Sequence, residues 1–152
     1  MNKFPIRAAT AEDVQQISDC VQAAYQHYIE RIGKPPGPML EDYSAVVQNH
    51  HVYVAADEKG NLAGLLVLIE QENGMLLDNV AVHPNFQGRK IGRLLMQKAE
   101  HEARQMGYDS IRLYTHEMMT ENRIIYQRLG YVETHRVHEK GFDRVYMQKV
   151  IN

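Results

Sequence analysis

Apolar residues recur with helical spacing in the first quarter of the chain. From Val14 to Ile32 they follow one another every three or four residues, which predicts a helix with one buried face. Thr10 is a favourable N-cap, and Asp13 stands three residues later in the capping-box position. Gly33 and the prolines after it predict the end of this helix. A shorter second helix is predicted over residues 39–47.

The middle of the chain changes to short apolar runs. Besides a first strand over residues 4–8, strands are predicted over 52–56, 62–70 and 75–82. Tight turns at 57–61 and 72–74 separate the last three, which is typical of an antiparallel meander.

Helical spacing then returns between further strands. A helix that starts after Gly92 and ends at Gly107, a strand over 110–116 and a helix over 120–129 are predicted, followed by a hairpin of 131–137 with 145–150. A strand–helix–strand unit after a meander favours an α/β fold of the α+β type. We therefore expect a mixed, mostly antiparallel sheet flanked by about four helices. The length of 152 residues suits one domain over residues 1–152.

Composition narrows the class of protein. The net charge is −2 and no basic block occurs, which argues against nucleic acid or a membrane surface as the main partner. Cys20 is the only cysteine, so no disulfide can form within the chain. Neither a signal peptide nor a run of 18 apolar residues is present, and we expect a cytoplasmic protein. With one cysteine and no HExxH, no metal site is expected.

A small basic loop follows the strand over 75–82 and opens a helix. Free amides at a helix N-terminus, together with the helix dipole, attract anions. Gly88 and Gly92 let a ligand approach closely, and Arg89, Lys90 and Arg93 add three cations. The loop therefore suits a pyrophosphate, although a plain turn with a solvated basic rim is the alternative. The loop matches neither of two nucleotide-binding motifs, the P-loop GxxxxGK[ST] and the dinucleotide-binding GxGxxG.

The segment from Gln87 to Gly92 resembles the acetyl-CoA signature of the GNAT superfamily, Gln/Arg-x-x-Gly-x-Gly/Ala. Gln87 and Gly92 match its ends, and Lys90 stands where the family prefers glycine. The resemblance implies a GNAT-type acyl-CoA N-acyltransferase fold whose loop amides hold the pyrophosphate of acetyl-CoA. It also implies that the pantetheine arm pairs with the strand over 75–82 in a central splay between the fourth and fifth strands. The implied cofactor contacts are Val80, Ala81, Val82, Gln87, Gly88, Arg89, Lys90, Ile91, Gly92, Arg93, Asn122 and Tyr126.

A second segment, Thr120 to Tyr131, resembles the late helix of the same family. Asn122 and Tyr126 are four residues apart and share a helix face. The resemblance implies that Asn122 binds the pantetheine arm and that Tyr126 holds its hydroxyl near the thiol. Many members have their asparagine seven residues before the tyrosine, where this chain has Met119. The alternative for Tyr126 is a half-buried packing role.

Acetylation of an amine needs a base for the amine and an acid for the thiolate. Tyr126 is the candidate acid, and the Val82 amide is the candidate donor to the oxyanion. The candidate bases are Asp78, His116 and Glu117. Strand alternation places Asp78 on one face with Val80 and Val82. The alternatives are a structural acceptor at Asp78 and surface roles for the other two bases.

The amine acceptor is implied to lie against the first helices and the last hairpin. The candidate residues there are Tyr28, Glu30, Tyr43 and Arg144. Glu30 or Asp42 would favour a cationic amine, whereas Arg136 or Arg144 would favour a carboxylate, and the sequence leaves both open. A homodimer is one assembly that the family uses. Two other functions stay open: a non-catalytic acyl-CoA-binding sensor or partner module, and an unrelated α/β domain for another phosphorylated ligand.

Overall fold

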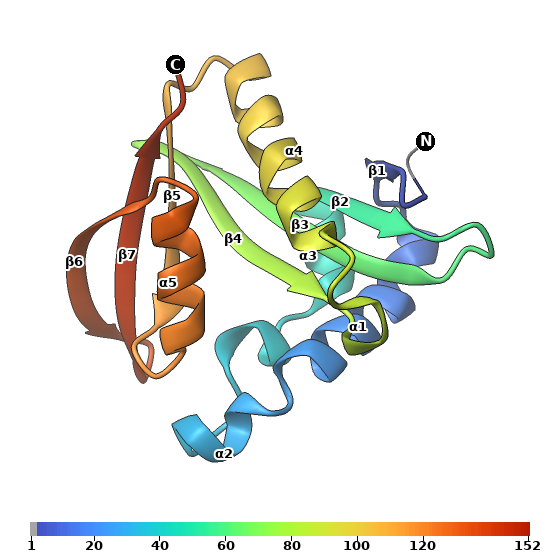
Figure 1. Cartoon of the computed structure of the whole chain (residues 1–152), viewed down its shortest axis with the longest axis horizontal. Coiled ribbons are helices and arrows are strands. Elements are labelled where there is room, and N and C mark those ends of the chain that lie inside the picture. Colours follow the sequence, from blue (N-terminus) through green and yellow to red (C-terminus); the bar gives the residue numbers. More distant parts are fainter. Residues whose placement is uncertain (1–2) are drawn as a thin grey trace.

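A computed structural model describes residues 3–152, and Met1 and Asn2 lie outside the described residues. Its seven strands form one sheet in the order β1-β2-β3-β4-β5-β7-β6 (Figure 1). All neighbouring strands are antiparallel except β4 and β5, which are parallel. The strands are β1 Ile6–Ala8, β2 His51–Ala56, β3 Leu62–Gln71, β4 Gly74–Val82, β5 Ser110–His116, β6 Val132–Glu139 and β7 Phe142–Val150. The predicted mixed, mostly antiparallel sheet is confirmed.

Five α-helices flank the sheet, where the sequence indicated about four. They are α1 Val14–Tyr25, α2 Tyr28–Ile32, α3 Tyr43–Asn49, α4 Ile91–Gln105 and α5 Thr120–Arg128, with 3₁₀ turns η1 Ala11–Asp13, η2 Gly37–Leu40 and η3 Pro84–Phe86. The continuous first helix predicted to Ile32 was wrong. The Ile29 amide bonds to the Gln26 carbonyl, three residues back, and this tighter turn divides α1 from α2.

The second helix begins later than its apolar pattern indicated. Met39 lies in η2, and α3 starts after Asp42, whose carboxylate accepts hydrogen bonds from the amides of Ser44 and Ala45 at 3.1 and 3.4 Å. Asp42 is therefore an N-cap, and its acceptor capacity is used within the helix.

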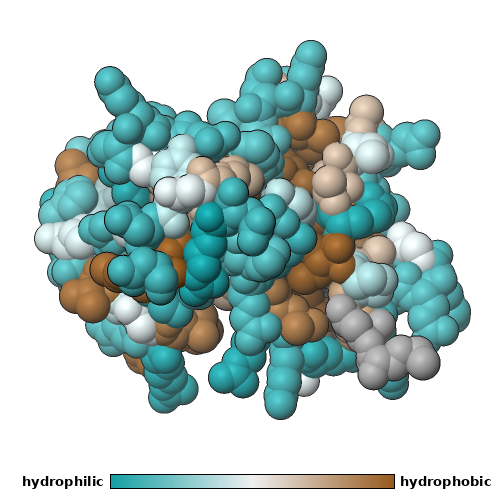
Figure 2. Space-filling view, turned by 90° about the horizontal axis from the view of Figure 1, so that it is seen from above, coloured by the Kyte–Doolittle hydropathy of each residue, from teal (hydrophilic) through white to brown (hydrophobic). Residues whose placement is uncertain are grey.

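The sheet has an apolar core on each face. On one face α4 packs against the sheet through Ile91, Leu95 and Ala99, in a cluster that includes Leu66 and Leu113. On the other face lie residues of α1 and α3. No helix in residues 3–152 has both the length and the apolar character needed to cross a bilayer. The face seen in Figure 2 is mostly hydrophilic, and its hydrophobic side chains appear in separate places.

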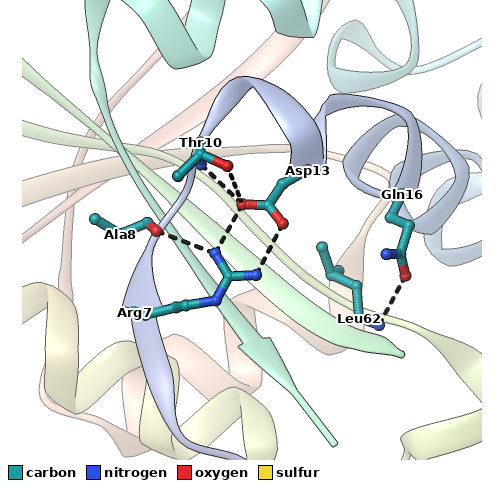
Figure 3. Close-up of polar contacts among 6 residues, drawn as sticks. All are labelled: Arg7, Ala8, Thr10, Asp13, Gln16 and Leu62. Atoms are coloured by element: carbon teal, nitrogen blue, oxygen red, sulfur yellow. Dashed lines mark hydrogen bonds and ion pairs between the residues drawn. The ribbon is translucent and has the colours of Figure 1, made fainter. Parts of the chain in front are cut away.

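Polar contacts fix the entry into α1 (Figure 3). Both terminal nitrogens of Arg7 donate to the Asp13 carboxylate at 2.8 Å, and the Thr10 amide donates to the same carboxylate at 2.8 Å. These bonds, from Arg7 first, lower the pKa of Asp13 to about 2. The Gln16 side chain accepts a bond from the Leu62 amide at 3.1 Å, which ties α1 to β3. The predicted Thr10–Asp13 helix start is present, with a 3₁₀ first turn.

A β-bulge interrupts β4 at Asp78. Leu77 pairs with Leu68 and Asn79 pairs with Val67, so Asp78 is an extra residue without a partner on β3. Leu77 packs in the core beneath α4, and so does Val80, three positions later. The expectation that Asp78 shares a face with Val80 and Val82 was therefore wrong. The extra residue shifts the alternation by one, and Asp78 points to the opposite face.

The parallel pairing of β4 and β5 stops after three residues. Met75, Leu76 and Leu77 pair with residues 111–113, and beyond them no ladder joins the two strands. Figure 1 shows β4 curving away from β5 in this part of the sheet. The predicted central splay between the fourth and fifth strands is confirmed.

Candidate functional site

The free edge of β4 faces the splay. The His83 amide donates to the Ala63 carbonyl on the β3 side at 2.8 Å, so the main-chain groups of Ala81 also point towards β3. Those of Val80 and Val82 therefore point into the gap. The Tyr25 hydroxyl donates to the Val80 carbonyl at 3.1 Å, which is consistent with this direction. A ligand that lies in the gap can pair with this edge as an added strand.

A cavity of about 660 Å³ runs along this edge. The main chain and side chains of β4 form one wall, and α5 forms another through Asn122 and Tyr126. Gln87, Gly92 and Arg93 close the end at the start of α4. Eight of the twelve implied cofactor residues line this one cavity: Val80, Ala81, Val82, Gln87, Gly92, Arg93, Asn122 and Tyr126.

The loop before α4 presents unpaired amides. Within residues 3–152, the backbone N–H groups of 88–93 have no acceptor. Gly88 has φ +81°, and Lys90 adopts the left-handed conformation with φ 62° and ψ 21°. Lys90 therefore takes the backbone shape for which the family prefers glycine. Arg89 lies over the Phe86 ring, and Ile91 is buried in the core. Amides and cations together form an anion site at the helix N-terminus.

A close contact with β3 fixes the position of α4. An added Cβ on Gly64 would lie 2.8 Å from the Ala81 carbonyl oxygen, 3.0 Å from Leu95 and 3.2 Å from Ile91. Only glycine lets the helix approach the strand this closely. Gly64 was not among the residues predicted from sequence, and its one signal is a glycine inside an otherwise apolar strand.

A second, smaller cavity of about 50 Å³ lies on the other side of the splay. The bulge residue Asp78, the end of β5 and Arg144 of β7 line it, as does the Pro36–Pro38 segment. Four residues line both cavities and form the wall between them: Tyr25, Val80, Asn122 and Tyr126.

Asp78 presents a partly buried carboxylate to the smaller cavity. Burial raises its pKa above the usual range, and a hydrogen bond from the Tyr114 hydroxyl at 2.9 Å opposes that rise. A carboxylate with a raised pKa is a better proton acceptor than an exposed one. Tyr114, which the sequence analysis did not single out, holds its orientation.

Tyr126 and Asn122 both line the two cavities, and their spacing predicted that they share a helix face. Burial raises the pKa of Tyr126 to about 12, so its hydroxyl keeps its proton at neutral pH. The Asn122 side-chain amide donates to the Met119 sulfur at 3.6 Å, which is a weak acceptor. Its carbonyl oxygen is an acceptor for the amides of a ligand.

His116 and Glu117 end β5 in different surroundings. His116 lines the smaller cavity, its Nδ1 accepts a bond from the Met118 amide at 3.0 Å, and burial lowers its pKa. Glu117 is exposed and pairs with Arg136 at 3.3 Å. It lines neither cavity.

The four candidate acceptor residues do not lie together. Arg144 lines the smaller cavity, Tyr28 lines the larger one, and Glu30 is exposed outside both. Tyr43 is buried, donates to the Pro38 carbonyl at 2.5 Å and accepts from the Asn79 side chain at 3.2 Å. It supports the wall of the smaller cavity from behind.

The sequence analysis also missed Asn79, whose side-chain oxygen accepts from the Tyr25 hydroxyl at 2.8 Å. Two adjacent polar residues, Asp78 and Asn79, inside an apolar strand were the available signal, because they break the two-residue period. Among residues 3–152, no three His, Cys, Asp or Glu side chains are arranged to hold a metal ion.

Comparisons with known proteins agree with this geometry. A family model described as "Acetyltransferase (GNAT) domain" matches residues 48–133. No curated protein matches the sequence. Among solved structures, nourseothricin acetyltransferase is similar with a TM-score of 0.75 at 18% identity, over 99% of this chain and 100% of that one.

Two further structures were solved with a coenzyme. The PaiA N-acetyltransferase of Thermoplasma acidophilum, in complex with coenzyme A, has a TM-score of 0.77 at 20% identity, over 99% of both chains. YncA of Salmonella typhimurium, solved with its cofactor acetyl-CoA, has a TM-score of 0.75 at 19% identity, over 99% of this chain and 95% of that one. These structures share the fold of this chain, and the family match, which spans more than half of the sequence, shows that the chain belongs to the GNAT acetyltransferase family.

Proposed function

We propose that this protein is an N-acetyltransferase that moves the acetyl group of acetyl-CoA to a primary amine of a small molecule or peptide. The observation that carries the proposal is the pair of cavities that meet at Tyr25, Val80, Asn122 and Tyr126. A thioester in one cavity and an amine in the other would meet at this wall. Residues 1–152 would act as one catalytic domain, in the cytoplasm.

The larger cavity suits the coenzyme. Its pyrophosphate would accept hydrogen bonds from the free amides of residues 88–93, with Arg93 adding charge. The pantetheine arm would pair with Val80 and Val82 across the splay. The Tyr25 hydroxyl donates a hydrogen bond to the Val80 carbonyl. When the pantetheine arm binds, the hydroxyl would share this carbonyl with the arm or lose the hydrogen bond.

The smaller cavity suits the amine. Asp78 or His116, directly or through water, would take the proton that the amine must lose before its lone pair attacks the thioester carbonyl carbon. The Val82 amide would donate to the oxyanion that forms. The C–S bond then breaks, and the coenzyme leaves as a thiolate that is protonated to the thiol.

Tyr126 would donate a hydrogen bond to the departing sulfur. Its pKa of about 12 lies above that of an ordinary thiol, about 8.5, so the bond would stabilise the thiolate without complete proton transfer. The proton lost by the amine can reach the sulfur through solvent.

Release of free thiol from acetyl-CoA, measured against a panel of amines, tests the proposal. We expect amine-dependent release together with a product that is heavier by one acetyl group. Tight binding of acetyl-CoA without release for any amine would instead identify a non-catalytic acyl-CoA-binding module.

A further inference from the structure

Arg144 holds a buried guanidinium at the smaller cavity. Its side chain is 11% exposed, and it lies 4.1 Å above the centre of the Tyr114 ring. Nη1 donates to Glu139 at 2.9 Å, and in residues 3–152 this is the one carboxylate with which Arg144 pairs. A guanidinium can bind a carboxylate through two nitrogens at once, so Arg144 retains capacity for a second anion.

The second nitrogen, Nη2, faces the segment that closes the cavity. A Cβ added to Gly37 would lie 3.7 Å from it, in ordinary contact. Gly37 itself lines the cavity between Pro36 and Pro38. Glu139 accepts from Nη1, so an anion that binds Nη2 from the cavity would not displace it.

The cavity offers a negative group next to this positive one. The Tyr114 ring supports the Arg144 guanidinium, and the Tyr114 hydroxyl binds the Asp78 carboxylate. The Tyr114 side chain thus contacts both the Arg144 guanidinium and the Asp78 carboxylate. The cavity is small, about 50 Å³, which favours an acceptor with a compact head group.

Other charges near the entrance disfavour polycations. Lys34 lies 4.4 Å from the centre of the Phe142 ring, which lines the cavity, and its ammonium donates to the Gly141 carbonyl. Glu30 and Asp42, the residues that would have favoured a cationic acceptor, do not line the cavity. Arg144 and Lys34 would repel the additional ammonium groups of a polyamine.

We propose that the acceptor is a small amine that carries a carboxylate a few bonds from its nitrogen, as an α-amino acid does. Its carboxylate binds Nη2 of Arg144, and its amino group lies towards Asp78 and the thioester. This inference rests on the proposed acetyltransferase function, whose chemistry it retains. It adds which amines are acetylated and names Arg144 as the residue that selects them.

Matched acceptors test the inference with the purified full chain. For each of several amino acids, kcat/KM is measured from thiol release for the acid, its carboxamide and its decarboxylated amine, with spermidine as a polycation. We expect the acid to be favoured over its two analogues by about 10- to 100-fold, the range for a hydrogen bond to a charged group.

Two variants assign the preference to Arg144. Arg144→Gln should remove most of it, chiefly through a higher KM for the acids, and Arg144→Lys should restore part of it. Lys59→Gln, in the exposed turn between β2 and β3, removes one positive charge away from both cavities and should leave the preference unchanged. Circular dichroism and the melting temperature show whether each variant is folded.

The possible failures differ. Equal or faster turnover of carboxamides, decarboxylated amines or spermidine by the wild-type protein would overturn the inference and leave the proposed function intact. The inference would also be overturned if Arg144→Gln lowered kcat/KM for acids and carboxamides by the same factor. Absence of thiol release with every amine would contradict the proposed function itself and this inference with it.

Discussion

At the scale of single residues, the bulge in β4 decides which side chains can take part in chemistry. Asp78 and Asn79 are neighbours in sequence, yet neither lies in the core beneath α4. Asp78 accepts from Tyr114 and lines the smaller cavity, whereas Asn79 bonds to Tyr25 and Tyr43. One residue thus presents a carboxylate to the smaller cavity, and the next supports the wall between the cavities.

Replacement of Tyr126 by Phe should slow catalysis while leaving coenzyme binding nearly unchanged. The variant keeps the ring that packs against Tyr131 and loses the hydroxyl beside the departing sulfur. We expect kcat to fall about 10²-fold or more, with little change in the Kd for acetyl-CoA. Stopped-flow or steady-state thiol release measures the first quantity, and calorimetry measures the second. An unchanged kcat would show that Tyr126 only packs.

The pH profile separates the two candidate bases in the smaller cavity. A base acts when deprotonated, so activity falls as the pH drops through its pKa. Burial raises the pKa of Asp78 and lowers that of His116, so variants are used to assign the acidic limb to one of them. Asp78→Asn should lower kcat/KM for the acceptor at neutral pH and remove the acidic limb. If this limb persists in Asp78→Asn and disappears in His116→Gln, the base is His116.

At the scale of elements, the contact between β3 and α4 fixes the anion site. The free amides of residues 88–93 depend on where α4 begins, and α4 begins where Ile91 and Leu95 pack over Gly64. The helix stripe and the basic loop were readable from sequence, because both are local patterns. The close approach at Gly64 joins residues about 30 positions apart, and no local pattern reports it.

Gly64→Ala should destabilise the protein by about 1–3 kcal/mol, the usual cost of overpacking a core. The new methyl group would meet a backbone oxygen at 2.8 Å, which a side-chain rotation cannot relieve. Urea unfolding measures the change in the free energy of unfolding. Gly92→Ala is the matched control, since its methyl group would meet only Val82 Cγ2 at 3.6 Å and alanine is the better helix former. Equal stability of the two variants would contradict this account.

At the scale of the whole molecule, the splay divides the sheet into two parts, and the two cavities lie where these parts separate. The backbone ladder that joins the first four strands to the last three has three residue pairs, all between β4 and β5. Beyond those pairs, Tyr25 and α5 complete the wall between the cavities. A coenzyme that bridges β4, α4 and α5 would link the two parts and stabilise the native state.

Acetyl-CoA at 100 times its Kd should stabilise the native state by about 2.7 kcal/mol. For a chain of this size, that corresponds to a rise in melting temperature of roughly 5–10 °C. NAD and ATP carry phosphates without a pantetheine arm and should raise it much less. Differential scanning fluorimetry with the three ligands makes the comparison. Stabilisation by ATP or NAD and none by acetyl-CoA would contradict the assignment of the larger cavity.

The sequence by itself determined the order of the strands, the basic loop that opens α4 and the shared helix face of Asn122 and Tyr126. Hydrophobic periodicity, glycines and helix ends act between near neighbours, so their consequences are visible locally. Only the tertiary structure decided that Asp78 and Val80 lie on opposite faces of the sheet. It also decided that Asp78 and Arg144 line the same cavity and that Glu30 lies outside it. Those placements depend on a bulge and on strands distant in sequence, where packing outweighs local preference.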